Sequence, residues 1–344
     1  TVLVQKGAGL GSMITDEEYV AAGAQMVATA KECWDCDMVV KVKEPLAPEY
    51  DLFHEGLILY TYLHLAPEPA LTKALLEKKV IGIAYETVQF DNGFLPLLAP
   101  MSEVAGRMAT QVGAQMLTKI EGGMGLLMGG TAGVQAAHVV ILGAGTVGLS
   151  AAKVAMGMGA RVTILDSNLF RLRQIDDLFG GRIQTLASNA FNIAAKDADL
   201  LVGSVLIPGA LTPKLVTEAM VKTMKPGSAI VDVAIDQGGC IEPTAKHGAT
   251  YHDKPTFKYP VNGGEVVCYS VGNMPGAVAR TSTFTLTNAT MPYMVDLANK
   301  GWKKACQDDK ALARGINTYD GKVYFKGVSD ALGYELHCTC DILK

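Results

Sequence analysis

The sequence HVVILGAGTVG, residues 138–148, decides the fold. Its apolar half is typical of a buried strand, and the motif G-x-G-x-x-G follows at once, formed by Gly143, Gly145 and Gly148. In this motif the first glycine permits a tight turn, the second lets the backbone approach a pyrophosphate, and the third lets a helix pack closely on the strand. The amides at the start of that helix face the phosphates. The segment therefore predicts a strand–turn–helix unit that binds a dinucleotide.

A second strand, predicted at Arg161–Leu165, leads into Asp166, about 20 positions after the glycines, where the motif requires an acidic residue. Asp166 is expected to accept hydrogen bonds from the adenosine ribose and to repel a 2′-phosphate, which favours NAD over NADP. Arg171 and Arg173 weaken this preference, because an arginine can bind the additional phosphate. A glycine turn without a ligand is the alternative, and the strand, the spacing and the acid together disfavour it.

Strands and helices alternate on both sides of this unit. Further strands are predicted at Met38–Val42, Leu57–Leu63, Val80–Ala84, His138–Leu142, Leu200–Val205, Ala229–Val233 and Val266–Val271. Helices are predicted from the capping box Thr15–Glu18 to Lys31, at Pro67–Leu76 and at Ser102–Ile120. The segment from Thr281 onward is also predicted to be helical, with Pro292 in a first turn and Tyr293–Lys300 helical. This alternation predicts an α/β protein with parallel sheets.

The composition limits the function classes. A length of 344 residues suggests two domains, and 49% hydrophobic against 19% charged residues excludes a disordered chain. A net charge of −4 implies no polybasic surface, so nucleic acid is not expected as a partner. The uncharged stretch Gly122–Ala152 is interrupted by glycine turns, so we do not expect it to span a membrane. The chain opens in an extended apolar run, TVLVQ, and we expect no signal peptide.

The seven cysteines are an odd number, which argues against a closed disulfide framework. Cys33 and Cys36 have the C-x-x-C spacing, but no second pair or histidine pair completes a zinc site. Cys338 and Cys340 lie near the end of the chain. We expect reduced, structural thiols, as in a cytosolic protein, and no metal.

Three residues follow predicted strands at their carboxyl ends, where open sheets bind ligands. They are Lys43, His64 and Asp236. A cation, a proton-transfer group and a polar anchor are what hydride transfer to a nicotinamide requires. Each residue also fits a structural role: a solvated lysine, a hydrogen-bonded histidine and a turn-forming aspartate. The residues alone leave both interpretations open.

Several segments, which extend from Gly7 to beyond Pro292, resemble the alanine dehydrogenase / nicotinamide nucleotide transhydrogenase family. They are GAGLGSMITDEEY, VVKVKEP, TYLHLA, IAYETVQ, LPLLAPMSEVAGR, VILGAGTVG, VDVAIDQGGC, VGNMPGAV and TSTFTLTNATMPY. The resemblance implies an NAD-dependent amino-acid dehydrogenase that converts L-alanine reversibly to pyruvate and ammonium by hydride transfer to NAD. It also implies a homo-hexamer in the cytoplasm.

The resemblance assigns roles to individual residues. Lys43 in KVKEP would hold the substrate carboxylate or carbonyl, and Met101 in APMSE would pack beside the substrate. His64 in LHLA would be the general acid/base. Asp236 in IDQGG would bind the nicotinamide ribose or the attacking water.

The resemblance assigns the remaining site residues to the cofactor. Ser102 would touch the pyrophosphate. Asn273, with Val271 and Met274, would line the nicotinamide pocket. Further NAD contacts would come from Gly143, Gly145, Thr146, Val147, Gly148, Asp166, Arg171, Ser188, Val205, Leu206 and Val233.

We expect two doubly wound domains, with a Rossmann NAD-binding domain inserted into a discontinuous substrate domain. The substrate domain would comprise residues 1–97 and 278–344, and the NAD-binding domain residues 98–277, with the substrate in the cleft between them. In the family a further strand–turn–helix unit precedes the segment that matches Thr1–Gln5, and it carries an arginine that grips the substrate. We expect the complete polypeptide to have it. A transhydrogenase-like NAD(H)-binding component and a non-catalytic dinucleotide-binding protein are the alternative functions.

Overall fold

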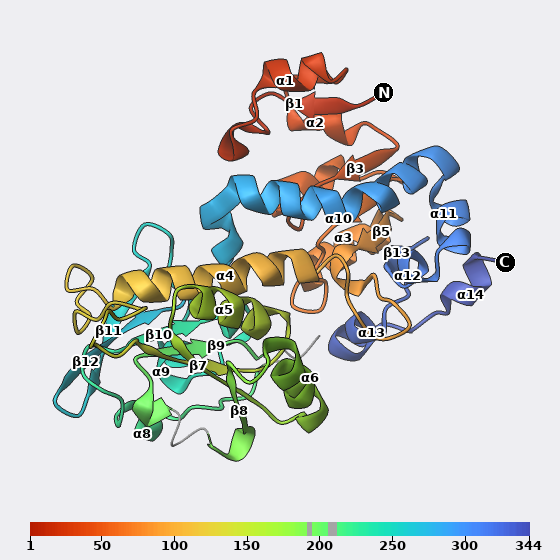
Figure 1. The fold of residues 1–344 in the computed structure, drawn as a ribbon. Coiled ribbons are helices and arrows are strands. Elements are labelled where there is room, and N and C mark those ends of the chain that lie inside the picture. Colours follow the sequence, from red (N-terminus) through yellow and green to blue (C-terminus); the bar gives the residue numbers. More distant parts are fainter. Residues whose placement is uncertain (191–194, 206–211) are drawn as a thin grey trace. The chain divides into compact units, whose positions relative to one another are not determined.

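Two compact units make up the chain in the computed structural model, which describes residues 1–190, 195–205 and 212–344 (Figure 1). Unit 1 comprises Thr1–Pro100 and Ala279–Lys344, and unit 2 comprises Met101–Val278. Unit 1 is therefore built from both ends of the chain, and unit 2 from the continuous segment between them. Helix α4 (Ala99–Met116) carries the chain from the first unit into the second.

Unit 2 contains a seven-stranded sheet in the order β11-β12-β10-β9-β6-β7-β8. Its strands are β6 (His138–Leu142), β7 (Arg161–Asp166), β8 (Gln184–Ala187), β9 (Leu200–Gly203), β10 (Ala229–Asp232), β11 (Thr256–Val261) and β12 (Gly264–Tyr269). All neighbours are parallel except β11 and β12, which form an antiparallel hairpin at one edge. With β6 as the first strand, the parallel strands follow the Rossmann order 3-2-1-4-5-6, which reverses between β6 and β9.

Both faces of this sheet are covered. Val139 and Ile141 of β6 belong to one buried cluster, whereas Val140 and Leu142 belong to the other. A strand buried on both faces reads as an unbroken apolar run, which explains the sequence of β6. The helical segments are α5 (Thr146–Gly157), α6 (Leu169–Phe179), α8 (Glu218–Val221) and α9 (Glu242–His247), with the 3-10 turns η4 (Ser188–Ala190), η5 (Val233–Gln237) and η6 (Met274–Val278).

Unit 1 contains a five-stranded sheet in the order β14-β13-β5-β4-β3 and a separate parallel pair, β1-β2. The strands are β1 (Leu3–Gln5), β2 (Gln25–Val27), β3 (Met38–Val40), β4 (Ile58–Thr61), β5 (Ile81–Ala84), β13 (Ile316–Tyr319) and β14 (Lys322–Val323). In the five-stranded sheet, β3, β4 and β5 are parallel to one another, so their carboxyl ends lie at the same edge of this sheet.

Helices cover both faces of the five-stranded sheet. Leu59 of β4 belongs to a cluster with Leu71 and Leu75 of α3, while the hydroxyl of Tyr60 on the opposite face donates to the carbonyl of Thr290 in α10 at 3.4 Å. The helical segments are α1 (Asp16–Ala21), α2 (Ala30–Trp34), α3 (Pro69–Glu77), α10 (Ala279–Lys300), α11 (Trp302–Asp308), α12 (Lys310–Ala313), α13 (Lys326–Leu332) and α14 (Thr339–Ile342), with η1 (Leu10–Ser12), η2 (Ala47–Leu52) and η3 (Tyr85–Thr87).

The predicted α/β class is confirmed, and each sheet contains the predicted parallel strands. Both sheets are nevertheless mixed, because β11, β13 and β14 pair antiparallel. The capping box of Thr15 and Glu18 is present. The helix predicted to continue to Lys31 is wrong. Gly23, with φ 95°, lies just after the end of α1, where the chain leaves the helical conformation. After β2, a second capping box at Thr29 begins α2.

The helix predicted from Thr281 onward is present as α10, but Pro292 lies in its interior, so the placement of Pro292 in a first turn is wrong. A proline in a helix interior removes one backbone hydrogen bond and costs about 3 kcal/mol. The buried side chains Leu286, Thr290 and Leu297 lie on both sides of the proline. Tertiary packing of the flanking turns therefore outweighs the local cost.

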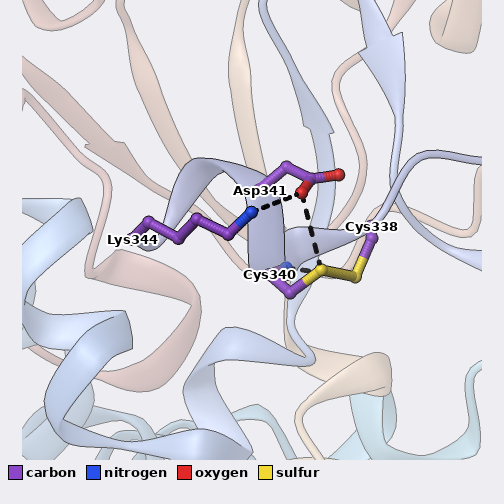
Figure 2. The surroundings of a disulfide bond; sticks show 4 residues. All are labelled: Cys338, Cys340, Asp341 and Lys344. Atoms are coloured by element: carbon purple, nitrogen blue, oxygen red, sulfur yellow. Dashed lines mark hydrogen bonds and ion pairs between the residues drawn. A yellow bond between two sulfur atoms is a disulfide. The ribbon is translucent and has the colours of Figure 1, made fainter.

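Cys338 and Cys340 form a disulfide, which corrects the expectation that all cysteines are reduced (Figure 2). Cys338 is the N-cap of α14, and this turn brings the two sulfur atoms together. The Oδ1 of Asp341 lies 3.8 Å from the sulfur of Cys340 and accepts a hydrogen bond from the ammonium group of Lys344 at 3.1 Å. The other five cysteines, Cys33, Cys36, Cys240, Cys268 and Cys306, are free thiols.

Among the described residues, no helix has both the length and the apolar character needed to cross a membrane.

The core of unit 2 yields a prediction on stability. Ile141 of β6 is 0% exposed, whereas Ile120 is 87% exposed. Ile141→Ala should lower the free energy of unfolding by about 2–5 kcal/mol, because the substitution removes buried contacts and leaves a cavity. Ile120→Ala, the matched control, should change it by less than about 0.5 kcal/mol. Urea denaturation followed by circular dichroism measures both, and equal effects would contradict the assignment of the core.

Candidate functional site

The turn after β6 is closely packed at two of its glycines and open at the third. Gly143 has φ 97°, and a Cβ there would lie 3.0 Å from Cγ2 of Val205. A Cβ at Gly148 would lie 1.9 Å from the carbonyl oxygen of Gly143. At Gly145, by contrast, a Cβ would meet nothing within 4 Å. The backbone at Gly145 is therefore open to a pyrophosphate, while the other two glycines make the turn itself.

The N-terminus of α5 supplies backbone donors at this turn. Its N-cap is Gly145, which has no side chain to bond the first amides, and Thr146, Val147 and Gly148 form the first turn. A helix start without a capping side chain has amides available, and its dipole favours an anion. These residues fit the pyrophosphate of a dinucleotide.

Asp166, the last residue of β7, joins the two neighbouring turns. Its Oδ2 accepts the amide of Ala144 at 2.7 Å, and its Oδ1 accepts the amide of Asn168 at 2.8 Å. A carboxylate has about four acceptor sites, so Asp166 keeps capacity for the ribose hydroxyls. The Nε of Arg171 donates to the carbonyl of Ala144 at 2.8 Å, which places this arginine against the same turn.

Residues that follow β9 and β8 lie beside the glycine turn or at the same end of the sheet. The hydroxyl of Ser204 donates to the carbonyl oxygens of Leu142 and Gly143, at 2.7 and 3.1 Å, and thereby ties the end of β9 to the glycine turn. Val205 follows it and lies beside Gly143. Ser188 begins η4, directly after β8. Leu206 lies outside the described residues.

The segment after β10 brings together two further predicted residues. Both carboxylate oxygens of Asp236 accept the amide of Asn273, each at 3.2 Å, and Asn273 has φ 55°. Asp236 lies in η5, a 3-10 turn, and not directly on a strand end. The side chains of Val271 and Met274 are buried in the core of unit 2. Val233 and Met101 pack against that same core, and Ser102 follows in α4.

Asp232, at the end of β10, was not predicted. Its carboxylate accepts hydrogen bonds from the amides of Cys240 and Ile241 and from the hydroxyl of Thr244 at 2.5 Å. Burial raises the pKa of Asp232, although these hydrogen bonds act in the opposite direction. Asp232 thus anchors the loop that carries Asp236.

In unit 1 the predicted Lys43 and His64 lie near each other. They follow the adjacent parallel strands β3 and β4, and the hydroxyl of Thr61 donates to the carbonyl of Lys43 at 3.1 Å. Two glutamates surround the histidine. Glu44 accepts at 3.2 Å from Nδ1 of His64, and Glu86 accepts the backbone amide of His64 at 2.6 Å.

These carboxylates set the protonation of His64. Burial lowers the pKa of His64, but the hydrogen bond to Glu44 and the negative charge of Glu86 outweigh it, so the net pKa is raised. The hydrogen bond with His64 in turn lowers the pKa of Glu44 to about 2. Glu44 is therefore a carboxylate at neutral pH, and its charge favours the protonated form of His64.

Glu44 and Glu86 were missed as site residues in the sequence, although a signal was present. Glu44 directly follows Lys43, and Glu86 follows the predicted strand at Val80–Ala84. An acidic residue just after a parallel strand is a candidate by the same rule that selected Lys43 and His64. Asp232 is the last residue of its strand, and the rule also covers it. Within the described part of the chain, no group of three or more histidine, cysteine or acidic side chains could hold a metal ion.

The glycine turn yields a prediction on cofactor binding. Gly145→Ala should leave the melting temperature nearly unchanged but weaken NAD binding about tenfold or more, because its Cβ occupies the open approach to the backbone. Gly148→Ala should lower the melting temperature as well, because its Cβ collides with the Gly143 carbonyl. Gly157→Ala, at the other end of α5 and also without contacts, is the control and should bind NAD normally. Calorimetric titration and thermal melts separate the three variants, and normal NAD binding by Gly145→Ala would refute the assigned approach.

Two family models match the chain. The alanine dehydrogenase/PNT N-terminal domain matches residues 1–105, and the alanine dehydrogenase/PNT C-terminal domain matches residues 109–326.

Relatives agree over almost the whole length. The chain is 99% identical over 346 residues to a protein named alanine dehydrogenase from Bilophila wadsworthia, across 100% of this chain and 92% of that protein. It is 61% identical to the alanine dehydrogenase of Methanococcus maripaludis, across 96% of this chain and 88% of that protein.

Solved structures show the same relationship. An L-alanine dehydrogenase superposes with a TM-score of 0.90 at 48% identity, across 97% of this chain and 91% of that chain. A transhydrogenase from Sinorhizobium meliloti superposes with a TM-score of 0.77 at 25% identity, across 94% of this chain and 90% of that chain. The glycine turn, the strand-end residues and these matches together show that the chain belongs to the alanine dehydrogenase/PNT family.

Proposed function

We propose that this protein is an NAD-dependent L-alanine dehydrogenase, which converts L-alanine, water and NAD reversibly to pyruvate, ammonium and NADH. The observation that carries the proposal is the 99% identity over the whole chain to the alanine dehydrogenase of Bilophila wadsworthia. The groups that the reaction requires are present in the chain: a dinucleotide turn in unit 2, and a cation and a proton-transfer group in unit 1.

NAD, when bound, supplies the acceptor for the hydride from the substrate Cα. The amides of α5 and the open backbone at Gly145 would hold its pyrophosphate, and Asp166 would hold the adenosine ribose. Asp236 and Asn273 would lie at the nicotinamide end. Contacts would also come from Ser102, Gly143, Thr146, Val147, Gly148, Arg171, Ser188, Val205, Val233, Val271 and Met274.

Residues of unit 1 would handle the substrate. Lys43, as a cation, stabilises the negative charge on the carboxylate and carbonyl oxygens. His64 takes the proton from the water that adds to the oxidised Cα, and later returns a proton to the departing amine. In the reverse direction ammonia adds to the carbonyl carbon of pyruvate, and the same histidine protonates the hydroxyl of the resulting carbinolamine, which leaves as water. Met101, the first residue of unit 2, would pack beside the small substrate side chain.

The substrate is proposed to be L-alanine in one direction, and pyruvate with ammonium in the other. We further propose that the chain assembles as a homo-oligomer, a hexamer by family resemblance, and that it acts in the cytoplasm. These proposals rest on the resemblance to the family.

The reaction itself is the first test. Purified protein with NAD should form NADH, seen by its near-ultraviolet absorbance, when L-alanine is added, and much less with other amino acids. The control is the same mixture with D-alanine. NADH formation only when an NADP-binding partner completes the reaction would favour a transhydrogenase-like component. NAD binding without any turnover would favour a non-catalytic dinucleotide-binding protein.

His64→Ala should lower kcat by about 10²–10⁴-fold, the usual contribution of one general acid/base. NAD binding should persist, because the cofactor groups lie in unit 2. His54→Ala is the matched control, since His54 also lies in unit 1 and bonds only backbone carbonyls, those of Glu55 and Cys36. Initial rates and NAD titration of both variants provide the measurement. Unchanged turnover in His64→Ala would refute the role of His64.

A further inference from the structure

The backbone of His64 is held in an unusual conformation. Its φ is 48°, a left-handed value that a residue with a side chain adopts only when its surroundings impose it. Glu86 supplies that restraint. Its carboxylate accepts the amide of His64 at 2.6 Å and the amide of Leu63 at 3.1 Å. Such charge-assisted hydrogen bonds are the strong ones, so the position of the His64 Cα is fixed.

The ring of His64 is held separately. Its plane stacks on the ring of Tyr62, with 5.8 Å between centroids and 16° between planes, and the hydroxyl of Tyr62 donates to the carbonyl of Leu97 at 2.6 Å. Stacking leaves the ring free to flip over about its bond to Cβ, and it does not decide which ring nitrogen carries the hydrogen. Glu44 restricts both, because its Oε2 lies 3.2 Å from Nδ1.

The chemistry of this contact determines which nitrogen reacts. A carboxylate only accepts hydrogen bonds, so Nδ1 must carry a hydrogen toward Glu44. In neutral His64 the proton then resides on Nδ1, and Nε2 is the basic nitrogen. The charged groups that face the ring are Glu44, Glu86 and Lys43, of which the two carboxylates favour the imidazolium and Lys43 opposes it.

We propose that Glu44 is a positioning residue for His64: it fixes the Nδ1–H tautomer and the ring orientation, so that Nε2 is the atom that exchanges the proton during turnover. The inference rests on the proposed function only in the part that concerns turnover. The tautomer and the orientation are properties of the resting protein.

Two substitutions separate the charge of Glu44 from its hydrogen bond. Glu44→Gln keeps an acceptor oxygen for Nδ1 but loses the charge. The acid limb of the pH profile of kcat/KM should then move to lower pH by about one unit, because the imidazolium loses a stabilising charge. The pH-independent kcat should stay within about threefold of the wild type, because the tautomer is kept.

Glu44→Leu removes the charge and the acceptor together. Its acid limb should move in the same direction, and its pH-independent kcat should fall about tenfold or more, because the tautomer is no longer fixed. Glu49→Gln is the matched control. Glu49 pairs with Lys41 and caps the amide of Leu46, and it has no contact with the histidine ring. This variant should keep the wild-type pH profile.

Nitrogen NMR of protein labelled at histidine tests the proposal without turnover. The chain has six histidines, and the signal of His64 is identified as the one that is lost in His64→Ala. The wild type and Glu44→Gln should show the Nδ1–H tautomer, and Glu44→Leu should show the other tautomer or a mixture. If Glu44→Leu fails to fold, the shift of the His64 titration in Glu44→Gln decides the question.

The outcomes remain distinguishable. A wild type that binds NAD but does not oxidise alanine would refute the proposed function, and the NMR experiment would still test the role of Glu44. A Glu44→Leu variant with the wild-type tautomer and the wild-type pH profile would overturn the inference. A fall in kcat without any change in tautomer or pH profile would also overturn it, since that pattern indicates a structural role alone.

Discussion

The close approach of helix α5 to the turn after β6 is the constraint on which unit 2 depends. Gly148 has no room for a Cβ, because the carbonyl of Gly143 lies where that atom would be. Ser204 and Asp166 bond the same turn from the two neighbouring strands. The turn is therefore fixed by β6, β7 and β9 together, and the amides of α5 point in one defined direction. Among the three glycines of the motif, only Gly145 has open space beside its Cα, and a phosphate group can approach the backbone there.

In unit 1, as in unit 2, functional residues follow the carboxyl ends of parallel strands, but here they are charged or titratable groups and not glycines. Three parallel strands end at one edge of its sheet, and each is followed by a charged or titratable group: Lys43 and Glu44 after β3, His64 after β4, and Glu86 after β5. Because the strands are about 4.8 Å apart, side chains from neighbouring ends reach hydrogen-bonding distance. The carboxylate partners raise the pKa of this histidine and thereby favour its protonated form.

The sequence-based predictions failed for two different reasons: local turn signals were overlooked, and tertiary packing overrode a local rule. The hairpins β11–β12 and β13–β14 were overlooked, although Asn262-Gly263 and Asp320-Gly321 between their strands are strong local turn signals. Asp320 and Gly321 have the positive φ values, 45° and 73°, that such a turn requires. The continuous helix through Pro292 is different, because a local rule argues against it. Its cause is the packing of α10 in unit 1, which no short segment of sequence encodes.

The sequence by itself determined the dinucleotide turn, the acidic residue after the second strand, and the strand ends that carry Lys43 and His64. These features are local, since a strand followed by a glycine motif has one favoured geometry. Tertiary structure alone decided that Glu44 and Glu86 lie on either side of His64, and that Asp236 bonds the backbone of Asn273. Those partners are up to 37 positions apart in the chain. They meet only because the strands pair in parallel, and the strand order depends on the burial of the whole sheet.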